Sequence, residues 1–403
     1  MSQSNLPAWM QRPFLGVALI ASCLVMMALT AAEFALRRAG SSITVLNDFD
    51  AFHIAGRLYW EGAINEVYDA RQLMAAQQRL AGAVQFTPWT YPPHFNLIVA
   101  VLALVPLAAG YALWIGSTLA GFGLALRRLA GPQTVFVLLA LFPAMLVCVR
   151  NGQSGLFIGA LMALFCHGVL AGRASAGLPL ALLTVKPHLL PAVGLYLLLT
   201  RQWRVILVGA LATLVLLGLA TALFGTGIWA GFLGAVRDAG SFLERGVYPF
   251  YRMVSLYAAL FRLGVPASIA LACQIGFGLL CLGLVLLAWR ARWPAHQLLA
   301  AALMASPMLS PYAYDYDLTI LAVALALLAP DLAATARAGS ASLLVLGGWV
   351  AGGSGLALGR LAQDPPGAYT APSVGIIGVL LVSSMALWLA RQAPQGNGAR
   401  GRI

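Results

Sequence analysis

Apolar residues along this chain form continuous runs that are separated by short polar segments. The first run extends from Phe14 to Ala32, and the run from Phe95 to Leu126 is longer still. A helix needs about 20 apolar residues to cross a hydrocarbon core of about 30 Å. The runs also lack the strand alternation of a transmembrane β-barrel. The pattern therefore predicts an all-α polytopic membrane protein, with the first run retained as a membrane span.

Several apolar segments are short or interrupted by proline. Pro106 divides the long run that begins at Phe95. We expect further membrane segments at Thr134–Val149, Leu156–Ala171, Leu178–Val185, Leu189–Leu199, Val205–Phe224, Ala267–Trp289, Leu298–Met308, Leu318–Leu328, Ser342–Leu358 and Val374–Leu389. Broken helices are tolerated at membrane depth where they face protein or a water-filled cavity, so these interruptions indicate an internal site.

A polar loop, residues 38–94, follows the first run. It holds five of the twelve acidic residues in the chain, namely Asp48, Asp50, Glu61, Glu66 and Asp69. Apolar residues recur at helical spacing from Phe52 to Tyr59, which predicts an amphipathic helix on the membrane interface, and a second is expected from Ala70 to Leu80. We therefore expect one integral-membrane domain, residues 1–390, with this loop as its main polar part.

Arginines in short loops set the expected orientation. They are Arg127, Arg128, Arg173, Arg201, Arg204, Arg290, Arg292, Arg337 and Arg391, and residues 391–403 read as a basic disordered cytoplasmic tail. Cytoplasmic placement of all of them follows the positive-inside rule. It requires that residues 92–105 enter the membrane without crossing it and that residues 178–199 form two crossings broken at Lys186. About twelve spans result, with both termini inside.

This topology gathers the polar motifs on the extracytoplasmic side. They are the acidic loop, residues 151–153, residues 186–188, the loop from Gly225 to Val265, and residues 312–317. In the alternative topology residues 178–199 form one kinked helix and residues 95–106 a true span, which would scatter the same motifs.

Composition supports a membrane protein and argues against nucleic acid as a partner. The chain is 61% hydrophobic with a mean hydropathy of +0.87, more apolar surface than a soluble core of 403 residues would bury. The net charge of +12 comes mainly from arginines that flank apolar segments. The five cysteines lie within apolar segments without metal-ligand spacing, so we expect small core residues, no disulfide and no metal site.

Asp48 and Asp50 are the candidate catalytic residues. A carboxylate beside an apolar surface suits a general base for a hydroxyl group. Either residue could instead cap the helix that follows it.

Lys186 is the leading candidate for binding a phosphate group. An ionisable residue inside a membrane segment indicates a functional site by default, although a lysine at a helix end can also extend toward the interface. Pro187 breaks the helix here, and His188 follows. Arg150 and Arg252 are further candidates for contacts with phosphate.

Other polar residues are candidates for substrate binding. Asn151 and Gln153 belong to a polar quartet that could also be a plain tight turn. Tyr312, Asp315 and Asp317 precede a late apolar segment, where an interfacial tyrosine belt is the alternative. Two residues at the end of the acidic loop, Tyr91 and His94, complete the set.

In this order, the motifs resemble glycosyltransferase family 87. The resemblance rests on Asp48-Phe49-Asp50, Tyr91-Pro92-Pro93, Asn151-Gly152-Gln153, Lys186-Pro187-His188, Ser255-Leu256, Ser310-Pro311 and Tyr316-Asp317-Leu318. It covers roughly residues 48–328, and its specificity lies in the ordered set, because each motif alone is weak.

The resemblance implies a GT-C-like bundle that transfers a sugar, with mannose the family's best-known one, from a polyprenyl-phosphate-sugar to a lipid or glycan acceptor. The family's first-loop aspartate corresponds best to Asp48. No cofactor or divalent metal is expected, and the site would face the extracytoplasmic side of a bacterial-type inner (plasma) membrane. A secondary transporter or a flippase of cell-envelope intermediates is the competing class, since broken helices and an intramembrane lysine suit transporters as well.

Overall fold

The computed structural model describes residues 4–38, 46–362 and 371–394, and this part of the chain is helical without strands. The first half contains η1 (Ala8–Gln11), α1 (Pro13–Arg38), α2 (Asp48–Trp60), η2 (Ile64–Tyr68), α3 (Ala70–Ala81), η3 (Pro93–Phe95), α4 (Asn96–Leu102), α5 (Leu107–Ala130), η4 (Gly131–Gln133), α6 (Thr134–Ala140), α7 (Phe142–Asn151), α8 (Gly155–Leu170), η5 (Ala174–Ala176), α9 (Gly177–Leu183), η6 (Pro187–Leu189) and α10 (Pro191–Leu199). The second half contains α11 (Trp203–Phe224), α12 (Gly227–Glu244), η7 (Phe250–Arg252), α13 (Leu256–Arg262), α14 (Ala267–Arg290), α15 (Ala295–Ala305), η8 (Ser306–Met308), η9 (Asp315–Leu318), α16 (Thr319–Thr335), α17 (Ala338–Ala362) and α18 (Gly375–Arg391).

Six helices among the described residues are long and apolar enough to cross a membrane. They are Pro13–Arg37, Leu107–Ala140, Trp203–Phe224, Ala267–Arg290, Asp315–Thr335 and Ala338–Leu361. Shorter apolar helices include Gly155–Leu170 and Gly375–Arg391. The protein is therefore a helical membrane protein with several crossings, whereas the count of twelve stays a prediction.

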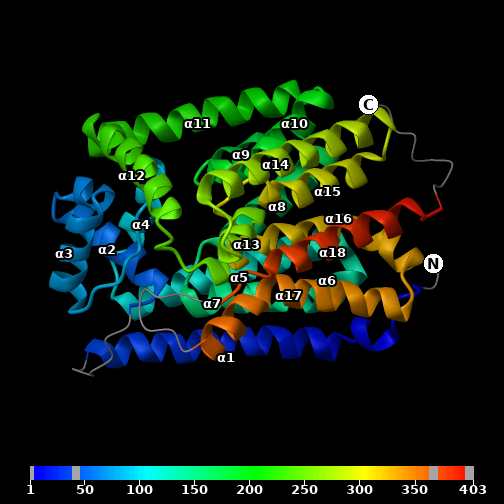
Figure 1. The fold of residues 1–403 in the computed structure, drawn as a ribbon, viewed down its shortest axis with the longest axis horizontal. Helices are drawn as coiled ribbons and strands as arrows, with labels where there is room; N and C mark the ends of the chain where they lie inside the picture. The colour runs from blue at the N-terminus through cyan, green and yellow to red at the C-terminus, as the bar shows by residue number, and fades with distance from the viewer. Residues whose placement is uncertain (1–3, 39–45, 363–370, 395–403) are drawn as a thin grey trace.

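The long helices run side by side between two ends of the molecule (Figure 1). The start of α1 and the end of α18 lie at one end, where the Asn5 N–H donates to the Ala333 carbonyl and Arg391 Nη1 donates to Gln297 Oε1 at 3.2 Å. We define this as the arginine end. The helices α2, α3 and α12 gather at the opposite end (Figure 1).

Residues 178–199 form a hairpin of two short helices, which differs from both predicted forms. At 1.5 Å per residue, the seven residues of α9 and the nine of α10 extend roughly 10 and 14 Å, so each is shorter than a membrane-spanning helix. Gly177, which begins α9, packs on Val205 and Gly209 near the start of α11, just after α10 ends. The segment therefore begins and ends on the same side of the molecule, as the first topology requires.

A second hairpin faces the first. The helices α15 and α16 lie antiparallel, because Gln297 near the start of α15 donates to Asp331 near the end of α16 at 2.9 Å. Lys186 at the tip of the first hairpin donates to Asp317 Oδ1 in the second at 2.6 Å, and both side chains are buried. This ion pair joins the two tips inside the protein.

The first polar loop folds into the two predicted helices, α2 and α3. The cap of α2 differs from the expectation that either aspartate could provide it. Asn47 is the N-cap, and the Asp50 carboxylate accepts from the Asn47 N–H at 2.6 Å, which completes a capping box. The short helix α4, roughly 10 Å long, does not cross a bilayer either, so residues 95–106 are not a true span.

Three other predictions need correction. The segment from Gly225 to Val265 contains α12, η7 and α13 and is not a simple loop. Cys273 is exposed on α14, whereas the other four cysteines are buried. Arg391 belongs to α18 and its guanidinium lies over the Trp293 ring at 4.9 Å, so the predicted tail does not begin there; residues 395–403 lie outside the described residues.

We expect Gly177→Ala to destabilise the protein. A Cβ at this position would lie 2.5 Å from Gly209 N and 2.6 Å from Val205 O, so α9 would have to move away from α11. Overpacking of this kind costs about 1–3 kcal/mol. Gly218→Ala on α11 is the matched control, because a Cβ there meets nothing within 4 Å. The free energy of unfolding is measured for both detergent-solubilised variants. Equal stabilities of Gly177→Ala and Gly218→Ala would contradict the tight packing of α9 on α11.

We also expect Lys186→Met to destabilise the protein by about 3–5 kcal/mol, because it leaves the buried Asp317 carboxylate without its ion-pair partner. The double variant Lys186→Met/Asp317→Asn buries no unpaired charge and should recover most of that loss. The same unfolding assay compares the two. A double variant less stable than the single one would show that the pair does not act as a unit.

Candidate active site

A cavity of about 440 Å³ lies where the two hairpin tips meet the first polar loop and the segment after α12. It is lined by Asp48, Ala51, Phe52, residues 85–91, Gln153, residues 185–188, Phe232, Val236, Ala239, Tyr248, Pro249, Tyr251, Arg252, Tyr312, Tyr314, Tyr316 and Asp317. The structure thus brings together the motifs that the first topology places on one side. The scattered arrangement of the alternative topology is not found.

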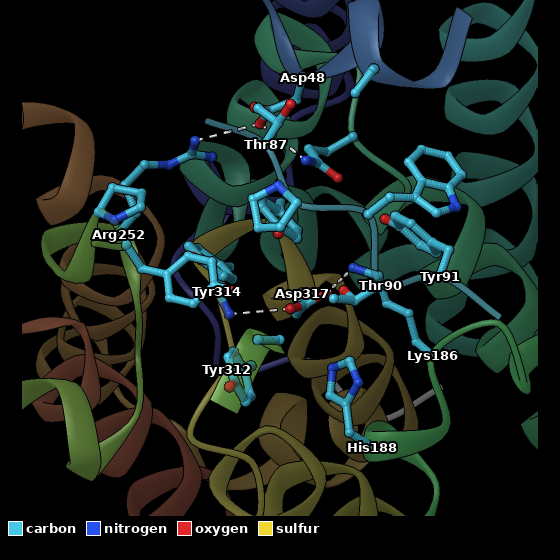
Figure 2. Close-up of a pocket in the computed structure, with 18 of the residues that line it drawn as sticks. Asp48, Thr87, Thr90, Tyr91, Lys186, His188, Arg252, Tyr312, Tyr314 and Asp317 are labelled. Atoms are coloured by element: carbon cyan, nitrogen blue, oxygen red, sulfur yellow. Dashed lines mark hydrogen bonds and ion pairs between the residues drawn. The ribbon is translucent and has the colours of Figure 1, made fainter. Parts of the chain in front are cut away.

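Arg252 contacts two carboxylates, Asp48 at the cavity (Figure 2) and Asp315 outside its lining. Its Nε and Nη2 donate to the two oxygens of Asp315 at 3.2 Å each, and its Nη1 lies 3.5 Å from Asp48 Oδ2. The backbone holds Arg252 in place, because the neighbouring Val254 N–H donates to the Ala313 carbonyl at 2.8 Å. Burial alone would lower the pKa of Arg252, but Asp315 and Asp48 outweigh it and hold that pKa well above the ordinary value. The guanidinium therefore stays charged.

Asp48 is the first residue of α2 and points into the cavity. Gln153 Nε2 donates to Asp48 Oδ2 at 3.0 Å. The turn that carries Gln153 is joined to the start of α2, since Asn47 Nδ2 donates to the Arg150 carbonyl at 2.7 Å. Asp48 is therefore a cavity carboxylate with a fixed backbone and two polar neighbours.

Lys186 lines the same cavity and lies apart from Asp48, with its ammonium group at Asp317 (Figure 2). Besides its bond to Asp317, its Nζ lies 4.6 Å from the centre of the Tyr316 ring and 5.9 Å from that of Tyr91. His188 also lines the cavity, and its buried Nε2 has no hydrogen-bond partner among the described residues. An orphaned ring nitrogen beside a buried ammonium is suited to a ligand with acceptor oxygens.

Several predicted residues lie outside the cavity lining. Asp50 pairs with Arg37 Nη1 at 2.8 Å, and Arg150 Nη1 lies 3.1 Å from Glu33 Oε2. His94 Nε2 is 3.1 Å from Thr184 Oγ1. Asn151 and Asp315 do not line the cavity, and Asp315 acts there through Arg252. This placement favours Asp48 over Asp50 as the base, and Lys186 over Arg150 as the phosphate contact.

The other predicted residues do line the cavity: Tyr91, Gln153, His188, Tyr312 and Asp317.

Several residues that line the cavity were not predicted from the sequence as site residues. Tyr314 and Tyr316 stack with ring centres 5.2 Å apart, and Tyr248 meets Tyr312 edge-on at 5.8 Å. Residues 85–90 and Phe232, Val236 and Ala239 of α12 also line the cavity. The positions in α12 recur at helical spacing, which could have revealed them.

The cavity combines a carboxylate, an ammonium group apart from it, and several aromatic rings. Aromatic faces and hydroxyl groups suit a carbohydrate ring, and the two charged groups suit a hydroxyl group and a phosphate. Among the described residues, no three His, Cys, Asp or Glu side chains converge as ligands for a metal ion.

Comparison with known proteins identifies the family. The sequence model of glycosyltransferase family 87 matches residues 89–311, more than half of the chain. The matched segment includes Gln153, Lys186 and Arg252, whereas Asp48 and Asp317 lie outside it. No curated protein and no solved structure gives a match. With apolar helices long enough to cross a membrane and more than half of its length matched, the chain belongs to glycosyltransferase family 87 and is a membrane glycosyltransferase.

Proposed function

We propose that the protein transfers a hexose, with mannose the first choice by resemblance, from a polyprenyl-phosphate-sugar to a hydroxyl group of a lipid or glycan. The observation that carries this proposal is that Asp48 and Lys186 line one cavity and lie apart in it. A direct displacement needs a base and a leaving-group site on opposite sides of the sugar.

The proposed reaction is a single displacement. Asp48 takes the proton from the acceptor hydroxyl while that oxygen forms a bond to the anomeric carbon. The bond from that carbon to the phosphate oxygen breaks, and its electron pair stays on the phosphate. The anomeric configuration inverts, and polyprenyl phosphate leaves.

The leaving phosphate gains one negative charge, so cationic groups near it would stabilise the transition state. Lys186 is the first candidate, and His188 supplies a ring nitrogen that no protein group uses. Arg252 lies next to Asp48, and its contacts with Asp315 and Asp48 keep its guanidinium group positively charged. Tyr316 connects the two cations, with its ring centre 4.6 Å from Lys186 Nζ and 5.6 Å from Arg252 Cζ.

A lipid-linked donor suits the side of the cavity formed by α12. Val236 lines the cavity and is 45% exposed, and Leu233 on the same helix is 52% exposed. Charged and polar residues, including Arg237, Asp238 and Ser241, occupy another exposed face of α12. A helix with separate apolar and charged faces is typical of a membrane interface. A hydrocarbon chain could leave the cavity beside Val236 without entering water.

The proposed orientation places the cavity on the extracytoplasmic side. Short loops at the arginine end carry the arginines that the positive-inside rule assigns to the cytoplasm, whereas α2, α3 and α12 lie at the other end. The protein would then work in a bacterial-type inner membrane.

Transfer of labelled mannose from polyprenyl-phosphate-mannose to membrane lipids by the purified protein tests the reaction. We expect Asp48→Asn to lower the rate by about 10²–10⁴-fold, because the base is lost. Asp50→Asn should retain the activity but unfold more easily, since it weakens the capping box and the contact with Arg37. Equal activity of Asp48→Asn and the wild type would refute the mechanism. Absence of transfer from this and other polyprenyl-linked sugars would refute the reaction.

We further expect transfer to continue in EDTA, because Lys186 and Arg252 supply the positive charge and the leaving group is a monophosphate. The same assay, with and without the chelator, measures this. Loss of transfer that added Mg²⁺ or Mn²⁺ restores would show that a divalent ion takes part.

A further inference from the structure

Both polar contacts of Asp48 are made by the same oxygen. Gln153 Nε2 donates to Oδ2 at 3.0 Å, and Arg252 Nη1 lies 3.5 Å from that atom. No described residue donates a hydrogen bond to Oδ1, and the Asp48 side chain is 19% exposed at the cavity. The two oxygens of this carboxylate are therefore in different environments.

We propose that Gln153 is a positioning residue for Asp48, which holds Oδ2 so that Oδ1 is the atom that takes the acceptor's proton. This inference rests on the proposed function. It replaces the expectation that Gln153 binds substrate directly.

The orientation of the Gln153 amide is determined by its neighbours. Its Oε1 accepts from the Ser154 N–H at 3.4 Å, so its NH₂ group points toward Asp48. The Ser154 hydroxyl in turn is 2.8 Å from the Tyr91 hydroxyl on the cavity wall. A flipped amide would place an oxygen against the Asp48 carboxylate, which is unfavourable.

The turn that carries Gln153 packs tightly against the start of α2. Gly152 has φ +67°, and a Cβ there would lie 2.4 Å from the Cβ of Phe49, the residue after Asp48. Trp114 Nε1 donates to the Gly152 carbonyl at 3.2 Å, and the Gln153 N–H donates to the Cys148 carbonyl at 3.0 Å. Because the turn and the first turn of α2 are in direct contact, the amide and the carboxylate keep their relative position without substrate.

The test measures transfer by Gln153→Ala and Gln153→Glu beside Asp48→Asn and the double variant Asp48→Asn/Gln153→Ala. Loss of a hydrogen bond to a charged group should lower kcat of Gln153→Ala by about 10- to 100-fold, with KM for both substrates nearly unchanged. Gln153→Glu keeps the shape of the side chain but opposes the carboxylate, so it should be slower than Gln153→Ala at neutral pH. In a protein that already carries Asp48→Asn, the further change Gln153→Ala should lower kcat only slightly.

The split between kcat and KM separates positioning from a purely structural role, because a misplaced base lowers kcat alone whereas a loosened cavity also raises KM. Gln78→Ala, on the exposed face of α3, is the control and should behave as the wild type.

Three results would overturn the inference. One is a raised KM with unchanged kcat, which indicates substrate binding. The second is a kcat of Gln153→Ala equal to that of the wild type, and the third is full additivity in the double variant. These are distinct from failure of the proposed function, which would appear as wild-type protein that transfers no sugar or as an active Asp48→Asn.

Discussion

The structure depends on one constraint, that charges removed from water must have partners. Lys186 and Asp317 meet at 2.6 Å with both side chains buried, and Arg252 makes two bonds to the buried Asp315. Removal of either partner would leave an uncompensated buried charge, which is far more costly than loss of the pair. The two hairpins therefore have to meet at their tips, and the cavity exists because they do.

The same contacts divide the cavity into two regions with separate tasks. In one region, the turn before Ser154 and the start of α2 hold a carboxylate and its amide neighbour as one unit. In the other region, Lys186 and His188 project from a hairpin tip. Tyr316 lies between the cations of both regions. A substrate that spans the cavity would contact groups contributed by segments that are far apart in sequence.

The sequence predicted the elements better than their pairing. A buried lysine indicated that a partner exists, but periodicity cannot show that the partner is Asp317, 131 residues later. Apolar runs give the length of a segment and not its path. For residues 178–199 the sequence was compatible with two crossings or one kinked helix, whereas the structure has a hairpin of two short helices. The helix α12 was missed because its apolar residues are divided between a protein face and an exposed face. Either aspartate could have capped α2 by its residue type, and only the fold shows that Asn47 does so.

The separation between Lys186 and Asp317 also has a consequence for biosynthesis. Chains are made from the N-terminus at about 5–20 residues per second, so Asp317 is added on the order of ten seconds after Lys186. During that interval the first hairpin has its ammonium group but not the carboxylate that neutralises it. A lysine at membrane depth without a partner costs about 2.5–3.5 kcal/mol or more. The tip of the first hairpin therefore reaches its paired state only after the ribosome has added a segment 131 residues further along the chain.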